Sequence, residues 1–347
     1  MAASRACAWM RIKRYSAGMA KTATRTGSRG LVAGIDLGGT NMSIGIVDSD
    51  HRIIGRCKRK TMVIEGSDAI IDRICEGVEK ACEDAGIKVK DLDAVGIGAP
   101  GAIDHSRGVV LIAPNLHWHD MPLRKRLEAK LSRPIIVDND VNVAAWGESR
   151  MGCASGRGDL LAVWIGTGIG GGLVLDGSLY RGEFFTAGEI GHTVIFPGGS
   201  PSARTVEQIC SRSGMSHSVR RLLPLYPDSA LHHLIDHDRP DGKIGSKVYA
   251  DAYKARDPLA IEIIEHAAEL LGIAIANWIT VLSIDTVVLG GGMTESMGSD
   301  WVKLVRKSFD ANVQPIELRQ CKLLETELKD TAGLLGAALL AADEVHA

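Results

Sequence analysis

The stretch LVAGIDLGGTNMSIGIVD, residues 31–48, combines two apolar segments with a turn built on glycine. LVAGID (31–36) predicts a strand, GGTN (38–41) a tight turn, and MSIGIVD (42–48) a strand that returns beside the first. Because glycine has no Cβ, the backbone N–H groups of such a turn can approach an anion, and the hydroxyl of Thr40 adds a donor. A single glycine hairpin is nevertheless weak evidence of function.

The same pattern occurs a second time, later in the chain. LLAVWIGTG (160–168) predicts a strand that meets a glycine turn, and GGLVLDG (171–177) predicts the returning strand. A further strand, IDTVVLGGG (284–292), also ends in glycines. Neither of the two hairpin turns matches G-x-x-x-x-G-K-[ST] or the dinucleotide-binding fingerprint. Two halves that open alike indicate an internal duplication, with a cleft between the halves in which ligands bind.

The elements around the first hairpin predict a mixed sheet flanked by helices. Residues 51–62 alternate as a third strand, residues 67–86 have helical spacing, and DAVGIGAPG (93–101) and RPIIVDND (133–140) each run from a strand into a turn. This order differs from a series of simple βαβ units. The second half contains a less regular helical insertion at about 206–258.

Composition excludes several classes of protein. Residues 1–30 hold seven of the 40 basic residues and no acidic residue, so the rest of the chain carries a formal net charge of −9. That charge argues against a nucleic-acid partner. No apolar run reaches the roughly 18–20 residues that span a bilayer, which predicts a soluble protein. Seven scattered cysteines without a C-x-x-C pair predict reduced thiols and a cytoplasmic location.

Residues 1–30 form a basic leader that we expect to be disordered. Its Arg, Ser and Ala content resembles an organellar transit peptide, and a start at Met19 is the alternative explanation. The remaining chain is expected to form a smaller domain from residues 31–146 together with 331–347, and a larger domain from residues 147–330.

VDNDVN (137–142) places three short polar side chains at the end of an apolar strand. Such groups are costly to bury unless they are paired or used. One interpretation is that Asp138 and Asp140 cap the helix that follows. The other is that a carboxylate here accepts a proton from a substrate, with amide groups beside it to hold that substrate.

Seven motifs together resemble the ROK family of sugar kinases and regulators (repressor, ORF, kinase), and most of all its glucokinases. They are DLGGTN, GAPGAID, NLHW, VDNDVN, GTGIGGG, AGEIGH and LGGGM, which occur in the family's order over roughly residues 31–343. The resemblance implies an α/β fold of two ribonuclease-H-like, actin-like ATPase domains. Each has a mixed sheet flanked by helices, and ATP and sugar bind in the cleft between them. It also implies a homodimer.

The resemblance assigns roles to residues of this chain. Asp140 would be the general base. Apart from the resemblance, Asp36 ends the first strand beside the first glycine turn, where a carboxylate can hold Mg²⁺ through water because Mg²⁺ keeps much of its hydration shell. The alternative is that Asp36 only forms the turn. Asp138 and Asn142 would hold the turn. The sugar would contact Gly101, Asn115, Asn139, Glu189, His192 and Glu207. The nucleotide would contact Gly38, Gly39, Thr40, Gly166, Thr167, Gly168 and Gly170, with Gly291 and Gly292 near adenosine.

The segment after His192 departs from the family pattern. There the family has C-x-C-G-x-x-G-C-x-E, whose cysteines bind a structural zinc ion together with the histidine. This chain reads FPGGSPSARTVEQIC (196–210), which keeps Glu207 but has Thr205 at the last cysteine position. Cys210 alone cannot supply three thiolates, so we expect no zinc.

The expected function is ATP-dependent phosphorylation of a hexose, with D-glucose as the first candidate. The alternatives are a kinase for N-acetylhexosamine, mannose or fructose, a glucokinase that uses polyphosphate, and a sugar-sensing regulator without catalytic activity.

Two stretches rich in small residues are expected to join the halves, namely VNVAAWGE (141–148) and GLLGAALLAA (333–342). Their Gly and Ala would let two helices cross closely, either as a hinge or as ordinary packing.

Overall fold

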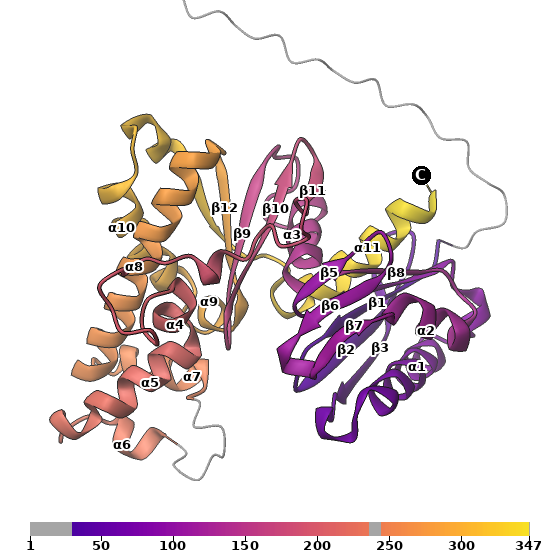
Figure 1. The fold of residues 1–347 in the computed structure, drawn as a ribbon, viewed down its shortest axis with the longest axis horizontal. Coiled ribbons are helices and arrows are strands. Elements are labelled where there is room, and N and C mark those ends of the chain that lie inside the picture. Colours follow the sequence, from indigo (N-terminus) through magenta and orange to yellow (C-terminus); the bar gives the residue numbers. More distant parts are fainter. Residues whose placement is uncertain (1–29, 236–243, 347) are drawn as a thin grey trace, which may run out of the picture.

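The computed structural model describes residues 30–235 and 244–346, so all of the predicted leader except Gly30 lies outside the described residues. Two bodies lie side by side, each built around a five-stranded sheet (Figure 1). The first sheet has the order β3-β2-β1-β4-β8 and the second has the order β11-β10-β9-β12-β13. The strands of the first are β1 (Val32–Leu37), β2 (Asn41–Val47), β3 (Ile53–Lys60), β4 (Ala94–Ala99) and β8 (Ile135–Asn139). Those of the second are β9 (Leu160–Ile165), β10 (Ile169–Leu175), β11 (Ser178–Tyr180), β12 (Thr286–Gly290) and β13 (Lys322–Glu325).

The two sheets have the same connectivity. In each, the first strand pairs antiparallel with the second and parallel with the fourth, and the last strand pairs parallel with the fourth. Both glycine hairpins form: the N–H of Gly38 donates to the carbonyl of Asn41 at 3.0 Å, and the N–H of Gly166 donates to the carbonyl of Gly168 at 2.9 Å. The predicted duplication and the mixed sheets are therefore confirmed.

Helices cover the sheets and form most of the second body. In the first body they are α1 (Ser67–Asp84) and α2 (Leu123–Leu131), which pack on one face of the sheet. In the second body they are α4 (Val206–Cys210), α5 (Arg212–Leu222), α6 (Leu231–Leu234), α7 (Ser246–Lys254), α8 (Pro258–Leu282), α9 (Gly291–Met297) and α10 (Ser299–Asn312). The predicted helical insertion corresponds to α4 through α7. None of the helices in the described ranges is long and apolar enough to cross a membrane.

Sequence reasoning missed a small antiparallel sheet inserted between β4 and α2. It consists of β5 (Ala102–Asp104), β6 (Val109–Ala113) and β7 (Trp118–Met121). These strands have three to five residues each, which is too short to establish an alternating pattern. The sheet matters to the cleft because Gly101 precedes β5 and Asn115 lies between β6 and β7.

Two helices connect the bodies in a reciprocal way. Helix α3 (Asp140–Arg150) follows β8 of the first sheet, yet of the two sheets it packs mainly on the second, at β9 and β10. Helix α11 (Ala332–His346) follows the second body, yet it packs on β1 and β4 of the first. The domain boundary expected between residues 146 and 147 thus falls inside α3. Buried residues of both helices and both sheets form one apolar cluster between the bodies.

Glycine allows α11 to approach both the first sheet and α3 at backbone distance. Gly34 and Gly96 are paired across β1 and β4, and a Cβ on either would lie about 2 Å from a carbonyl oxygen of α11. A Cβ on Gly336 would lie 1.7 Å from the carbonyl oxygen of Val143 in α3, and one on Gly147 would lie 3.2 Å from the Cα of Gly336. The close crossing expected from the sequence is therefore present.

The crossing predicts that Gly336→Ala destabilises the protein. In an exposed helix, alanine in place of glycine stabilises by about 1 kcal/mol. At residue 336 the added methyl group must displace the backbone of α3, so we expect a loss of about 1–3 kcal/mol in the free energy of unfolding, measured by chemical denaturation.

Gly158→Ala is the control, because nothing lies within 4 Å of a Cβ at that position. Equal stability of the two variants would mean that the helices tolerate side chains at their crossing.

Candidate active site

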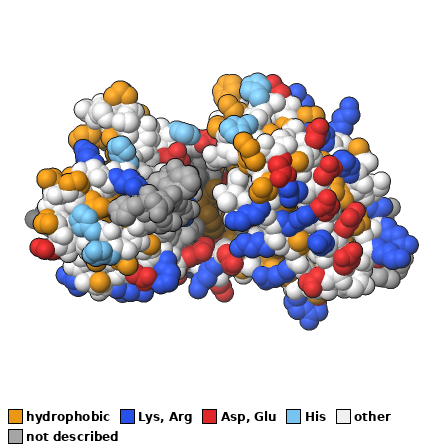
Figure 2. Space-filling view, turned by 90° about the horizontal axis from the view of Figure 1, so that it is seen from below, with side chains coloured by type: hydrophobic (Ala, Val, Ile, Leu, Met, Phe, Trp, Pro, Cys, Tyr) orange, Lys and Arg blue, Asp and Glu red, His pale blue; other side chains and the backbone are white. Residues whose placement is uncertain are grey.

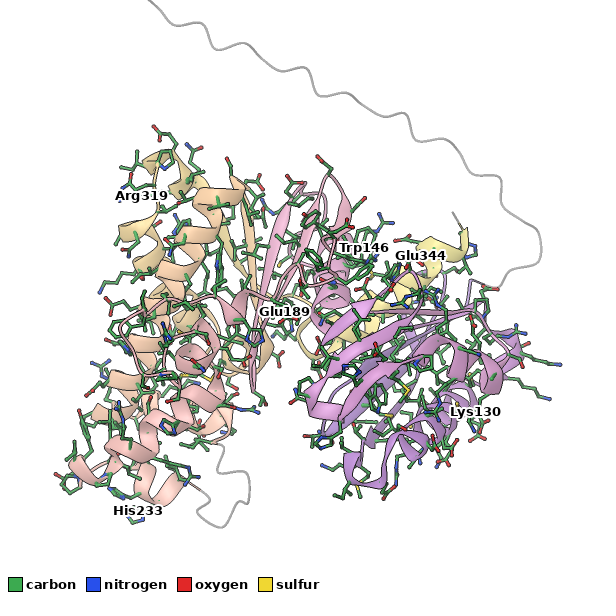
Figure 3. The ribbon with its side chains drawn as sticks, in the orientation of Figure 1. Lys130, Trp146, Glu189, His233, Arg319 and Glu344 are labelled. Atoms are coloured by element: carbon green, nitrogen blue, oxygen red, sulfur yellow. The ribbon has the colours of Figure 1, made fainter. Side chains whose placement is uncertain are left out.

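Two cavities occupy the hollow between the bodies that Figure 2 shows, and they meet at Asp140. The larger, about 460 Å³, is called the Glu189 cavity here, and Figure 3 shows Glu189 at the junction of the two bodies. It contains all six residues that the sequence predicted to contact a sugar: Gly101, Asn115, Asn139, Glu189, His192 and Glu207. These residues come from both halves of the chain, so the tertiary fold assembles them at one place.

The second cavity, about 340 Å³, is called the Asp36 cavity. Of the residues predicted to bind nucleotide or metal, Asp36, Gly38 and Gly291 line it. Asp140, Val141 and Trp164 line both cavities. The predicted second phosphate loop, residues 166–170, borders the Glu189 cavity instead, while Gly39, Thr40 and Gly292 line neither cavity.

Asn139 caps helix α3, so the alternative interpretation that Asp138 and Asp140 cap it is wrong. Its Oδ1 accepts hydrogen bonds from the N–H groups of Val141 and Asn142 at 2.8 and 3.1 Å, and its Nδ2 donates to the carbonyl of Gly101 at 3.0 Å. The cap leaves one amide N–H of Asn139 for a ligand in the Glu189 cavity. It also fixes Asp140 as the first residue of the helix, at the border of the two cavities.

Asp138 joins the two bodies through a buried ion pair. Its carboxylate is about 1% exposed and accepts hydrogen bonds from Nε and Nη2 of Arg181, both at 2.7 Å. Its other oxygen accepts from Nδ2 of Asn142 at 2.9 Å, which agrees with the predicted turn-holding role of both residues. Arg181 follows β11 in the second body. Sequence reasoning missed it, because nothing in the local sequence marks it as a partner of Asp138.

Asp36 and Asp140 are carboxylates with raised pKa values. Burial raises the pKa of Asp36 to about 6, and the charge of Lys58 opposes this shift. Burial and the nearby charge of Asp36 raise the pKa of Asp140 to about 7, while the N–H of Val141 opposes this shift. Carboxyl groups that lie close together and are withdrawn from water resist simultaneous ionisation. Asp140 is therefore poised to exchange a proton near neutral pH.

Glu189, His192 and Glu207 form the wall of the Glu189 cavity that belongs to the second body. Burial raises the pKa of Glu189; the charge of His192 lowers it and that of Glu207 raises it. Nε2 of His192 lies 3.6 Å from Oε2 of Glu189. Oε2 of Glu207 accepts a hydrogen bond from the N–H of Ile169 at 2.8 Å and so supports the second glycine turn. The imidazole and carboxylate groups match the vicinal hydroxyl groups of a sugar.

Hydrogen bonds organise the segment that departs from the family's zinc pattern. Thr205 caps α4 by accepting from the N–H of Gln208 at 3.3 Å, and Oε1 of Gln208 accepts from the N–H of Arg204 and of Thr205. Cys210 is fully buried in the core, and burial raises the pKa of its thiol to about 12. Within the described residues, no group of three or more His, Cys, Asp or Glu side chains could hold a metal ion.

The Asp36 cavity also contains charged residues that sequence reasoning missed. Lys58 and Lys329 line it, together with Glu295 and Asp330. The alternating pattern of β3 could have placed Lys58 on one face of the sheet, but not over Asp36, because the register between strands is not encoded locally.

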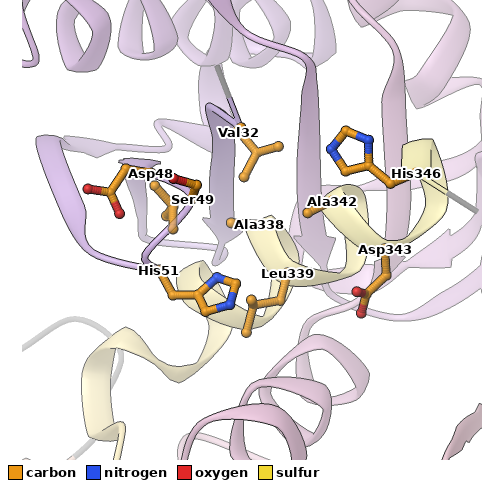
Figure 4. A pocket seen from close by; sticks show the side chains of 11 residues that line it. Val32, Asp48, Ser49, His51, Ala338, Leu339, Ala342, Asp343 and His346 are labelled. Atoms are coloured by element: carbon orange, nitrogen blue, oxygen red, sulfur yellow. The ribbon is translucent and has the colours of Figure 1, made fainter. Parts of the chain in front are cut away.

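A separate hollow lies over β1 and the C-terminal half of α11 (Figure 4). Its polar side chains are those of Asp48, Ser49, His51, Asp343 and His346, and none of the predicted site residues lines it. We assign it no role in the candidate site.

Comparisons with known proteins show which family the chain resembles over nearly all of its described length. The model of the ROK family matches residues 32–344. A glucokinase of Halalkalibacterium halodurans is 31% identical over 88% of this chain and 93% of its own length. A glucokinase of Streptomyces coelicolor is 32% identical over 90% of this chain and 98% of its own length.

A solved structure supports the same relationship. The ROK family glucokinase of Streptomyces griseus, in complex with glucose and AMPPNP, is 34% identical, with a TM-score of 0.80. The match covers 90% of this chain and all of that one. The predicted two-domain actin-like fold is confirmed.

The buried ion pair predicts that Arg181→Ala lowers stability strongly. Removal of one partner leaves the carboxylate of Asp138 charged and buried, which costs about 3–5 kcal/mol. Chemical denaturation would measure the loss in the free energy of unfolding.

Arg52→Ala should change stability little, because Arg52 is 70% exposed and its ion pairs lie at the surface. A loss in Arg181→Ala that is no larger than in this control would show that the pair contributes little to holding the bodies together.

Proposed function

Because the chain belongs to the ROK family, we propose that it is a sugar kinase that transfers the γ-phosphoryl group of ATP to a hexose, with D-glucose as the acceptor. The observation that carries the proposal is the position of Asp140. It borders the cavity lined by all six candidate sugar-binding residues and also the cavity that contains Asp36, Gly38 and Gly291. A group at this junction can act on an atom that passes from one ligand to the other.

The Glu189 cavity supports binding of a polyhydroxylated ligand. Its wall in the first body offers the free amide N–H of Asn139 and the side chain of Asn115, and its wall in the second offers Glu189, His192 and Glu207. These groups include both donors and acceptors, as sugar hydroxyls require. Sugar held between the two bodies would orient one hydroxyl toward Asp140, and closure of the cleft would exclude water from the transfer.

Asp140 would accept the proton of the attacking hydroxyl. Phosphoryl transfer needs an aligned nucleophile and stabilisation of charge, and a carboxylate positions the hydroxyl and takes its proton. With a pKa of about 7, Asp140 is ionised in a large fraction of molecules at neutral pH while still being basic enough to take a proton. The cap at Asn139 fixes the orientation of this carboxylate at the start of α3.

Asp36 fits the requirements of a magnesium site. Carboxylate oxygens are the ligands that Mg²⁺ prefers, and the ion needs few of them because it keeps water ligands. A cation beside Asp36 would also relieve the repulsion that raises the pKa of Asp140. When bound with the nucleotide, the ion would neutralise charge on the phosphates. The adenosine would lie toward Gly291 and Gly292.

We also propose that the protein is a homodimer and that it is located in the cytoplasm.

A panel of donors and acceptors tests the proposed function. Purified protein should phosphorylate D-glucose with MgATP, with a higher kcat/KM than for mannose, fructose, N-acetylglucosamine or N-acetylmannosamine, and with a higher rate than polyphosphate supports. Asp140→Asn should lower kcat by about 10²–10⁴-fold while glucose binding persists, because a general base contributes about that much.

A preference for another hexose or for polyphosphate would replace the proposed substrate or donor. Sugar binding without turnover under any condition would favour a regulator. If Asp140→Asn keeps the kcat of the wild type, Asp140 is not the general base.

The raised pKa of Asp140 predicts a stability difference that depends on pH. Its pKa lies at about 7 in the folded protein against an ordinary 3.8, so its contribution to stability is full below pH 3.8 and is lost as the pH rises to about 7. Asparagine does not ionise, so the Asp140→Asn variant does not lose this stability as the pH rises. In the absence of Mg²⁺, its Tm should exceed that of the wild type at pH 8 by several degrees or more, because a rise in pKa from 3.8 to about 7 corresponds to about 4 kcal/mol.

The difference should shrink as the pH falls toward 5. A Tm difference that is the same at both pH values would mean that the pKa of Asp140 is not raised in the folded protein.

A further inference from the structure

A row of polar side chains crosses the first sheet at the floor of the Asp36 cavity. Asp36 of β1 is paired with Ser43 of β2, and Ser43 is paired with Lys58 of β3. Residues that are paired directly across strands project from the same face of a sheet. All three line the cavity, and Asp140 lies beside them. The ammonium group of Lys58 therefore belongs to the same site as the two carboxylates, and its charge lowers the pKa of Asp36.

Lys329 reaches the same cavity from the second half of the chain. It begins a short 3-10 turn (Lys329–Thr331) that leads from β13 into α11. Its φ of +50° lies in the left-handed region, which residues other than glycine occupy at a cost of about 1–3 kcal/mol. Such strained residues concentrate at functional sites, where the surrounding structure holds them in place.

A buried carboxylate holds this strained turn. Glu148 of α3 is fully buried, and its side chain accepts hydrogen bonds from the hydroxyl of Thr326 and from the N–H of Leu328 at 3.0 Å. The hydroxyl oxygen of Thr326 in turn accepts from the N–H of Lys329 at 3.1 Å. Glu148 and Asp140 belong to the same helix, so the turn that carries Lys329 is fixed relative to the candidate base.

The charges of the Asp36 cavity indicate the class of ligand that it takes. Four carboxyl groups line it, those of Asp36, Asp140, Glu295 and Asp330, and the two lysines face them. None of the ion pairs among residues 30–235 and 244–346 involves Lys58 or Lys329. A bare phosphate would meet repulsion from the carboxylates. A phosphate chain that carries a divalent cation would present positive charge to the carboxylates and phosphate oxygens to the lysines.

We propose that Lys58 and Lys329 form a clamp, one lysine from each half of the chain, on the metal-bound phosphate tail of the phosphoryl donor. The inference rests on the proposed kinase function and adds residues that neither the glycine turns nor the motifs of the sequence indicate. Because the lysines come from opposite halves, closure of the cleft would bring both onto one phosphate chain. Thr326 and Glu148 act as positioning residues for Lys329.

Direct binding measurements test the clamp separately from catalysis. Calorimetry would compare wild type, Lys58→Gln, Lys329→Gln and the double variant, with magnesium tripolyphosphate and with magnesium AMPPNP as ligands. We expect each single variant to bind both ligands at least about tenfold more weakly, because one hydrogen bond between charged groups contributes about that much to affinity. Glucose binding should stay unchanged. Lys80→Gln, on the exposed surface of α1 and outside both cavities, should bind as the wild type does.

Lys329→Gly separates a ligand-binding role from a structural one. Glycine adopts a positive φ without strain, so this variant should have a higher Tm than the wild type and yet bind magnesium tripolyphosphate as weakly as Lys329→Gln does. Lys329→Arg should keep most of the affinity. A lower Tm in Lys329→Gly combined with unchanged affinity would give Lys329 a purely structural role and overturn the clamp.

The outcomes distinguish this inference from the proposed function. If the wild type phosphorylates glucose but the glutamine variants bind both ligands normally, the clamp is wrong and the kinase proposal stands. If the wild type phosphorylates no sugar and the variants still lose tripolyphosphate binding, the clamp stands without that function. No binding of either ligand by the wild type would refute the clamp.

Discussion

Helices α3 and α11 meet without side chains between them, because Gly147 and Gly336 bring the two backbones into contact. Each helix leaves one half of the chain and packs on the sheet of the other. The relative position of the two bodies is therefore set at one crossing with little tolerance for added volume. Both cavities of the cleft have walls from both bodies, so their shape depends on this contact as well.

Helix α3 connects that crossing to the candidate chemistry. Asn139 caps the helix and Asp140 begins it at the border of the two cavities. Two turns later, Glu148 holds the segment that leads into α11. Just before the helix, Asp138 pairs with Arg181 of the second body. A movement of one body against the other would thus act on groups that are bonded to this short segment, which links closure to the position of the proposed base.

The buried carboxylates of the cleft differ in how their negative charge is compensated. Burial raises the pKa values of Asp36 and Asp140, and the charge of Asp36 raises that of Asp140 further, so the charged forms that a magnesium-dependent kinase would use are unfavourable in the unliganded protein. Cationic ligands would offset this cost, and the charge of Lys58 in the same row already lowers the pKa of Asp36. Asp138 and Glu148, by contrast, are buried with hydrogen-bond donors on both oxygens and serve the architecture.

Local patterns of residues were enough to predict the main elements of the fold. Alternating apolar residues and glycine turns predicted the paired hairpins and the mixed sheets, and two stretches rich in Gly and Ala predicted the crossing helices. The motifs identified six residues that the fold gathers in one cavity. The short strands β5–β7 were missed because three to five residues carry too little periodicity. Only the tertiary structure paired Asp138 with Arg181, Glu148 with Thr326, and Lys58 with the row that contains Asp36. Strand register and the contact between the two bodies bring these partners together. Both depend on residues that are far apart in the sequence, so the local sequence around any one partner does not reveal the other.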